Sequence, residues 1–255
     1  MAGKKSIQQL QKESKGFTLR GLENTRIESL SDGVFAISIG LLLLSTTPPN
    51  TFNELMKFTK SFIPFAMTIS MLMFVWHQHY LFFIRFGLRD TRTVALNTVL
   101  LFLVLFFVYP LKFLFSLLVD LYTGLFTGDQ EYLRELFSTT IRIEDTGTLM
   151  SLYGFGAASI FLVLALLNTI ALKRKELLEL SKEEVIHTRN TIRVNLICGG
   201  IPLLSALIAA FELGGRATFA IAGFSYMLYA VLMPIASIRG NKQLAALKKD
   251  NDSNQ

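Results

Sequence analysis

The sequence is poor in charged residues, in histidine and in cysteine. Charged residues make up 17% of the 255 residues, and the chain holds three histidines and one cysteine. The lone cysteine, Cys198, excludes a disulfide bond within the chain. Because Cys198 lies in an apolar run, we expect it to be a small buried side chain.

Motifs of hydrolases and metal sites are absent. The sequence has no Gly-x-Ser-x-Gly turn, no His-Glu-x-x-His pair and no Cys-x-x-Cys. His77 and His79 are two residues apart, so on a helix they point to different faces and do not share a metal without ligands from elsewhere. We therefore expect no catalytic residue, no bound metal and no cofactor. A membrane enzyme built on these two histidines stays as an alternative.

Two motifs of common ion channels are missing as well. There is no Thr-Val-Gly-Tyr-Gly stretch, whose carbonyl oxygens form a potassium filter. No apolar run carries an arginine at every third position, as a voltage sensor does. The chain is therefore not an ordinary potassium channel.

What the sequence does have is long apolar runs. Apolar residues make up 51% of the chain, phenylalanine alone supplies 22, and the mean hydropathy is +0.46. A transmembrane helix needs ~20 apolar residues, whereas a transmembrane barrel shows alternating segments of ~10 residues, which this sequence lacks. The pattern predicts an all-α polytopic membrane protein with six transmembrane helices. The predicted spans are 27–45, 52–86, 94–119, 149–172, 192–211 and 217–238.

The basic residues predict the orientation of these spans. With both termini inside, the cytoplasmic segments hold 19 of the 25 Lys and Arg residues, as the positive-inside rule requires. The net charge of +6 therefore reflects membrane topology, and no nucleic-acid partner is expected. The predicted domains are a cytoplasmic N-terminal tail (1–25), a six-helix domain (26–240) and a cytoplasmic C-terminal tail (241–255).

The first span carries an apolar stripe and, on another face, an acid. At ~100° per residue, four apolar side chains fall within about 60° of one another. Asp32 lies about 140° from Ile37 on the same wheel. The two faces therefore meet different surroundings. The stripe consists of Leu30, Ile37, Leu41 and Leu44, with Gly33 and Gly40 beside it.

Polar residues in the next two predicted spans lie at about the same depth in the membrane as Asp32. Ionisable groups inside spans are costly and are usually paired or functional. We expect the polar groups of the three spans to hydrogen-bond one another near the inner ends. A plain anchor helix, with its stripe facing lipid and Asp32 near the headgroups, is the alternative. The expected group consists of Arg26, Ser31, Asp32, Trp76, His77, His79 and Asn97.

The same residues resemble the signature of a known family. The stretch R-I-E-S-L-S-D, residues 26–32, is similar to the R-x-x-x-F-S-D signature of the transmembrane protein 175 family, the potassium channels of lysosomes and many bacteria. Leu30 stands where the signature has Phe. Two further blocks are similar to the family's pattern: Trp76 with His79, then Phe82 and Phe83, and Asn97 with Pro110.

The resemblance implies a bacterial-type member in the plasma membrane. Such a chain forms a homotetramer in which the first helices of four subunits surround the pore. Carried over by position, the apolar constriction falls on Ile37, with Leu41 and Leu44 as further layers. Gly40 replaces a threonine that many members carry, so the preference for potassium over sodium is expected to be modest at best. Beside the pore we place Gly33, Ser38, Gly40 and Ser45.

Together with this resemblance, the sequence predicts a passive cation channel that conducts potassium through an apolar side-chain constriction. Its expected partners are monovalent cations, the bilayer and further copies of the chain, with K⁺ in the pore. A proton-conducting channel is the nearest alternative, because Asp32, His77 and His79 carry titratable groups. A membrane scaffold that transports nothing is the other.

Overall fold

The computed structural model describes residues 17–23, 25–44 and 48–253, and these form helices joined by short turns. Six of the helical stretches in this part of the chain are long and apolar enough to cross a membrane. This confirms the predicted all-α membrane fold. The helices are α2 (Arg26–Leu44), α3 (Phe52–Lys60), α4 (Phe62–Phe86), α5 (Thr91–Thr127), α6 (Gln130–Glu135), α7 (Thr146–Lys173), α8 (Lys182–Ala210), α9 (Thr218–Phe224) and α10 (Leu228–Ser253).

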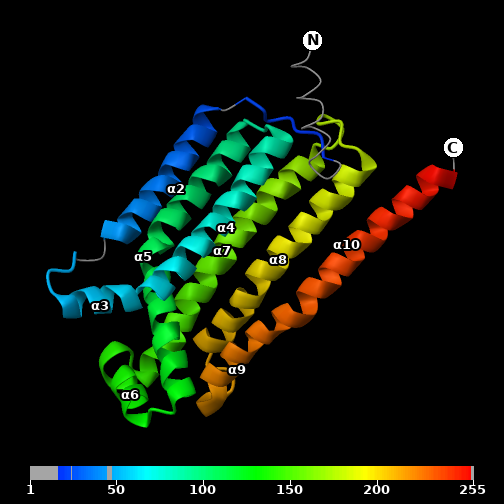
Figure 1. The fold of residues 1–255 in the computed structure, drawn as a ribbon. Helices are drawn as coiled ribbons and strands as arrows, with labels where there is room; N and C mark the ends of the chain where they lie inside the picture. The colour runs from blue at the N-terminus through cyan, green and yellow to red at the C-terminus, as the bar shows by residue number, and fades with distance from the viewer. Residues whose placement is uncertain (1–16, 24, 45–47, 254–255) are drawn as a thin grey trace.

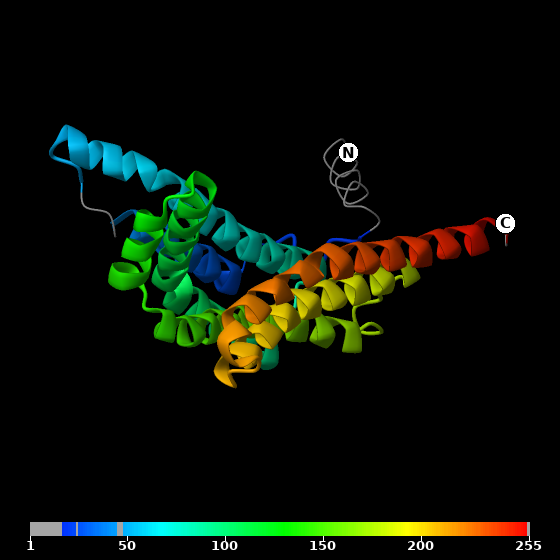
Figure 2. The same ribbon diagram turned by 90° about the horizontal axis from the view of Figure 1, so that it is seen from below.

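The long helices lie side by side, with α2 and α10 at opposite edges (Figure 1). α2 packs on α4 and α5, whereas α10 packs on α8. The short helix α3 points away from the bundle (Figure 2). We call the end at which α2, α5 and α8 begin the basic end. Both described termini lie towards this end (Figure 1).

α7 and α8 form an antiparallel pair in the middle of the bundle. Their backbones approach closely because small residues lie between them. A Cβ atom added at Gly154 would lie 2.5 Å from the Pro202 carbonyl oxygen and 2.7 Å from Ala206 Cβ. The glycine is therefore required by packing.

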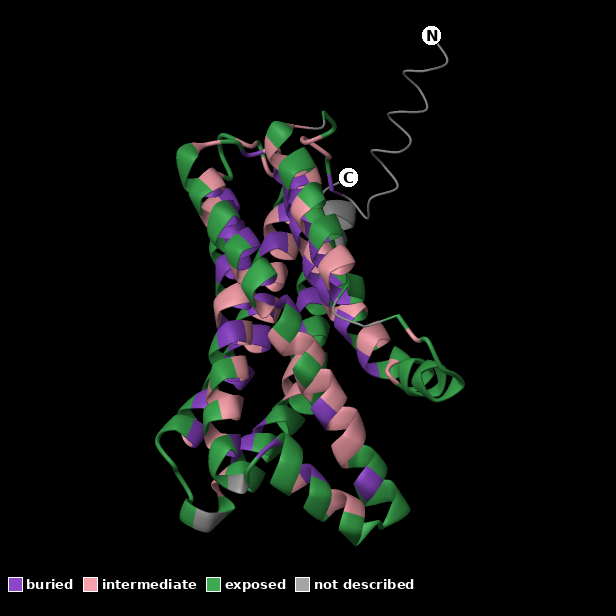
Figure 3. Cartoon of the chain, turned by 90° about the vertical axis from the view of Figure 1, so that its left-hand side faces the viewer, coloured by how far each residue is buried: buried purple, intermediate pink, exposed green. Residues whose placement is uncertain are grey.

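The burial pattern follows the helix faces (Figure 3). Buried side chains of α2, α4, α5 and α7 form one apolar core that includes Phe35, Phe82 and Leu164. Outward faces are exposed and apolar, which suits a chain surrounded by lipid. Phe17, before the first span, also belongs to this core.

Several helices extend beyond the predicted spans. α8 begins at Lys182, ten residues before the predicted limit of 192, where Ser181 and Glu184 form a capping box. α5 continues to Thr127 and ends at Gly128, whose φ of 70° only glycine adopts readily. α10 runs to Ser253 through the predicted C-terminal tail. These extensions are polar or amphipathic, so a hydropathy criterion misses them.

The predicted N-terminal tail also differs where it is described. Residues 17–23, which we call the strap (Phe17–Glu23), lie over the basic end and pack against α4. Arg20 and Gly21 donate their backbone N–H groups to the Ile84 carbonyl at 3.1 and 3.0 Å. This part of the predicted tail is thus part of the packed structure.

Candidate functional site

α2 has two faces with opposite surroundings. Buried residues recur every three or four positions and face α4 and α5. On the other side Ile37 is 59% exposed and Leu44 is 80% exposed, with Leu41 half-buried between them. Among the residues that the structure describes, this apolar stripe is therefore left uncovered. The buried face consists of Ser31, Phe35, Ser38 and Leu42.

The buried face is held by polar side chains from three helices. Asn97 of α5 donates its side-chain N–H to Ser31 Oγ at 3.0 Å, and Ser31 donates to the Ile27 carbonyl at 2.8 Å. His79 Nε2 of α4 lies 2.8 Å from Asn97 Oδ1. Because an amide oxygen only accepts, Nε2 carries the proton and donates it. All three side chains are buried and hydrogen-bonded, so they fix how α2, α4 and α5 meet.

Asp32 lies beside this network on the exposed side. Trp76 donates its indole N–H to Asp32 Oδ1 at 2.8 Å. The indole stacks on Tyr80, with ring centroids 5.6 Å apart. A pocket of about 300 Å³ opens here towards the strap, lined in part by Asp32 and Glu28. Asp32 therefore has a fixed hydrogen-bond donor and stays open to solvent.

Two members of the expected polar group lie apart from it. His77 is exposed on another face of α4, where its ring stacks against Tyr80 at 6.4 Å. Arg26 is exposed, and within the described residues its guanidinium has no hydrogen-bond partner. Among the described residues of the single chain, His77 and Arg26 therefore lie outside the hydrogen-bonded network. Neighbours two residues apart on a helix diverge by ~200°, so His77 and His79 have different surroundings.

The residues predicted beside a pore are divided by the structure. Ser38 is fully buried and donates its hydroxyl to the Val34 carbonyl at 2.8 Å, so it lies with the packed face. Gly33 and Gly40 lie towards the open side, and a Cβ at either would meet nothing within 4 Å. Packing within the chain therefore does not require these glycines. Ser45 lies outside the described residues.

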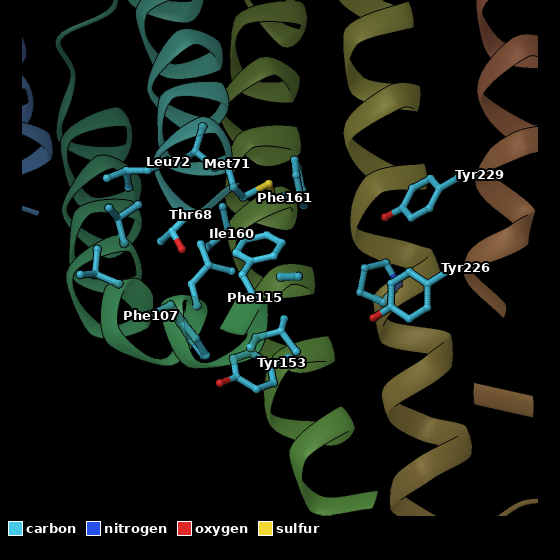
Figure 4. A pocket seen from close by; sticks show the side chains of 17 residues that line it. Thr68, Met71, Leu72, Phe107, Phe115, Tyr153, Ile160, Phe161, Tyr226 and Tyr229 are labelled. Atoms are coloured by element: carbon cyan, nitrogen blue, oxygen red, sulfur yellow. The ribbon is translucent and has the colours of Figure 1, made fainter. Parts of the chain in front are cut away.

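A separate cavity of about 210 Å³ lies inside the bundle (Figure 4). Its lining comes from α4, α5, α7, α8, the short 3₁₀ helix Ser225–Met227 and the start of α10, and no residue of α2 takes part. Three of its four lining hydroxyls donate to backbone carbonyls: Thr68 to Pro64, Tyr153 to Pro110 and Tyr229 to Cys198. The lining of this space is therefore mainly apolar.

The sequence did not predict one charged pair at the basic end. Asp90 caps the start of α5 and receives two N–H groups of Arg174, at 2.6 and 2.9 Å. Hydrogen bonds from Arg174 hold the pKa of the Asp90 carboxyl well below its usual range. Asp90 was recognisable as a helix cap, but nothing in the sequence pairs it with a residue 84 positions later.

No metal centre is present among the described residues, because they hold no group of three or more His, Cys, Asp and Glu side chains. Cys198 is buried, as expected. The geometry therefore offers a helix with an anchored face and an open apolar face.

Comparisons with known proteins identify the family. Residues 26–107, which hold all the residues of the polar network, match the family model described as endosomal/lysosomal potassium channel TMEM175. A protein of Marivirga tractuosa named "Potassium channel" is 40% identical over 238 residues, 92% of this chain and 94% of that protein.

A solved structure supports the same assignment. The crystal structure of a variant of the potassium channel MtTMEM175, in complex with a Nanobody-MBP fusion protein, is 39% identical in sequence. It superposes with a TM-score of 0.79 over 90% of this chain and 98% of that chain. The family comprises ion channels rather than enzymes. With this likeness along nearly its whole length, the chain belongs to the transmembrane protein 175 family of potassium channels.

Proposed function

We propose that four copies of the chain form a passive cation channel that conducts potassium along a central pore lined by α2. The observation that carries the proposal is the exposed stripe of Leu30, Ile37, Leu41 and Leu44 on a helix whose opposite face is anchored by hydrogen bonds. Symmetry favours this arrangement, because a rotational assembly brings the same face of each copy to one axis. The relatives' names supply the permeant ion.

The proposed gate is apolar. Rings of Ile37, Leu41 and Leu44 would narrow the pore, and such a constriction stops ions by dewetting before it closes sterically. A small rotation or outward shift of α2 would widen it and readmit water. The polar network at Ser31 and Asn97 does not touch the ion in this proposal. It sets the rotation of α2 and thereby the width of the gate.

Ion preference in this pore would be modest. Gly33 and Gly40 lie towards the proposed pore and carry no hydroxyl, and Ser38 is turned into the subunit. No ring of oxygen atoms then replaces the hydration shell at the constriction. We expect potassium to be preferred over sodium only weakly.

The basic residues support an orientation with both termini in the cytoplasm, in the plasma membrane of a bacterium. The proposed partners are therefore the bilayer, three further copies of the chain and monovalent cations. No resident cofactor is needed for passive conduction, because the driving force is the ion gradient itself.

The direct test is flux from proteoliposomes under separate K⁺, Na⁺ and H⁺ gradients. The proposal predicts potassium flux and a weaker sodium flux, and Ile37→Asn should raise the single-channel conductance by hydrating the constriction. Asn53→Gln, an exposed polar substitution on α3, is the matched control and should leave conductance unchanged. Unchanged conductance in Ile37→Asn would contradict the gate.

Proton conduction is the second candidate, since Asp32 and His77 are exposed titratable groups on the spans. His79 is buried behind Asn97 and does not reach the open face of α2. Flux driven by a pH gradient without potassium would favour this alternative. Absence of any flux would favour a scaffold.

A further inference from the structure

We infer that Arg20 is a positioning residue for α2: through it the strap ties the start of the proposed pore helix to the turn between α7 and α8, and so sets how readily the gate opens. The inference rests on the proposed function, because it takes α2 as the helix that lines the pore.

The strap begins with a buried aromatic anchor. Phe17 is buried and meets Phe86 at the end of α4 edge to face, with ring centroids 5.5 Å apart. The Arg85 guanidinium lies over the Phe17 ring, 5.0 Å from its centroid. An aromatic ring held from two sides in this way fixes the start of the strap on α4.

The strap backbone then completes the end of α4. The last carbonyls of a helix lack partners within the helix, and that of Ile84 accepts the N–H groups of Arg20 and Gly21. A Cβ at Gly21 would lie 2.1 Å from the Phe83 carbonyl oxygen, and Gly87 faces the Arg20 carbonyl with a φ of +58°. Two glycines thus permit an approach that no larger residue allows.

The Arg20 side chain extends from the strap, away from α4, to the α7–α8 turn. Its Nε donates to the Leu178 carbonyl at 2.7 Å, and an Nη2 hydrogen reaches the Glu179 carbonyl at 3.3 Å. The guanidinium also donates hydrogen bonds to both carboxylate oxygens of Glu184, at 2.8 and 3.0 Å. This fork geometry is specific to arginine, because lysine offers only a point charge.

Glu184 is a buried charge that accepts hydrogen bonds from the strap and from the start of its own helix. It is 1% exposed, and besides Arg20 it accepts the backbone N–H groups of Thr18 and Ser181 at 2.8 and 2.7 Å. A buried carboxylate loses much of its stabilisation when its cation is removed. The strap and the α7–α8 turn are therefore joined by specific hydrogen bonds around Arg20 and Glu184 rather than by nonspecific contact.

The strap leads directly into α2. Two residues separate Glu23 from Arg26, where α2 begins, and Thr25 and Glu28 hydrogen-bond each other's backbone at the helix start. α2 itself packs on α4 and α5. The strap thus adds a connection from α2 to the α7–α8 turn, and a shift of that turn would pull on the first turn of α2.

The test is single-channel recording of the full-length protein in planar bilayers, for Arg20→Gln, Glu184→Gln and the double variant. We expect open probability to change at least threefold in each single variant and by a similar amount in the double variant, because both remove the same contact. Unitary conductance and the K⁺/Na⁺ preference should stay as in the wild type. Lys182→Gln, an exposed substitution at the first residue of α8, is the charge control and should leave open probability unchanged.

Three outcomes overturn the inference: open probability within twofold of the wild type in both single variants, additive effects in the double variant, or altered unitary conductance. Should Arg20→Gln fail to assemble, Glu184→Gln and Arg20→Lys decide by the same criteria. Failure of the proposed function is recognised separately, by unchanged conductance in Ile37→Asn. A raised conductance there together with unchanged open probability in the strap variants would reject the inference alone.

Discussion

Leu42 and Leu44 lie two positions apart on α2 and have opposite surroundings. Leu42 is fully buried against α4 and α5, whereas Leu44 is 80% exposed. The two faces of α2 do not separate polar from apolar side chains as the faces of a helix in a soluble protein do. The hydroxyls of Ser31 and Ser38 lie on the buried face, and the open face is apolar.

The difference shows what each face is built for. Apolar contact is not directional, so lipid replaces an apolar neighbour at little cost. Hydrogen bonds are directional, and a buried polar group without a partner is costly, so the Ser31–Asn97–His79 network favours one resting orientation of α2. One face therefore determines orientation, and the other is free to form a surface shared between subunits.

The largest expected effect is a difference in unfolding free energy between variants of Leu42 and Leu44. Leu42→Ala should lower the unfolding free energy in detergent by about 2 kcal/mol or more, because it removes a fully buried side chain. Leu44→Ala should change it by less than about 0.5 kcal/mol. Thermal unfolding of both variants measures the contrast, and equal destabilisation would mean that α2 does not have a packed and an open face.

The polar network gives the next effect. Asn97→Ala removes the partner of both Ser31 and His79 and should cost about 1 kcal/mol, the scale of hydrogen bonds between membrane helices. Ser31→Ala should cost less, and the double variant should show a coupling of a few tenths of a kcal/mol or more. Full additivity in this cycle would show that the two side chains do not stabilise each other.

A smaller effect is expected from Asp32, at the edge between the two faces. Asp32→Ala should reduce the yield of the proposed tetramer and leave the K⁺/Na⁺ preference unchanged, because its carboxylate accepts a hydrogen bond from Trp76. Trp76→Phe removes the same bond from the other side and should give the same result. Size-exclusion chromatography and reversal potentials measure the two quantities. A normal tetramer with altered ion preference would assign Asp32 to the pore instead.

The smallest effect lies off α2, at the Asp90–Arg174 pair. The pKa of Asp90 is lowered in the folded state, so its stabilisation is present above the unfolded value of ~3.9 and is lost as pH falls through the folded value. The thermal midpoint of the wild type should exceed that of Asp90→Asn at pH 7, and the gap should shrink below about pH 4. A difference between the two thermal midpoints that stays constant with pH would show that the Asp90 carboxyl does not cause it.

Much of this arrangement follows from the sequence because it depends on local patterns. Apolar runs of membrane-spanning length predicted six spans, and the angle per residue separated Ile37 from Asp32. Matching depths along consecutive spans predicted that Ser31, Asn97 and His79 meet. The same reasoning gave no means of excluding His77, which matches in depth but points elsewhere.

Contacts between distant segments escaped prediction. Arg20 and Glu184 are 164 residues apart, and neither stands in a pattern that indicates a partner. The strap looked like a polar tail, because its packing depends on Phe17 and on two glycines in unrelated segments. Polar helix extensions such as the start of α8 lie outside the predicted spans because they contribute no hydropathy signal.

The central claim is that the open face of α2 lines the pore, and two neighbouring positions test it most directly. In a Cys198→Ala background, Ile37→Cys and Ser38→Cys each place one thiol on α2, the first on the open face and the second on the packed face. Potassium current should be blocked by silver ions in Ile37→Cys and should persist in Ser38→Cys. Block at Ser38→Cys with none at Ile37→Cys would contradict the claim.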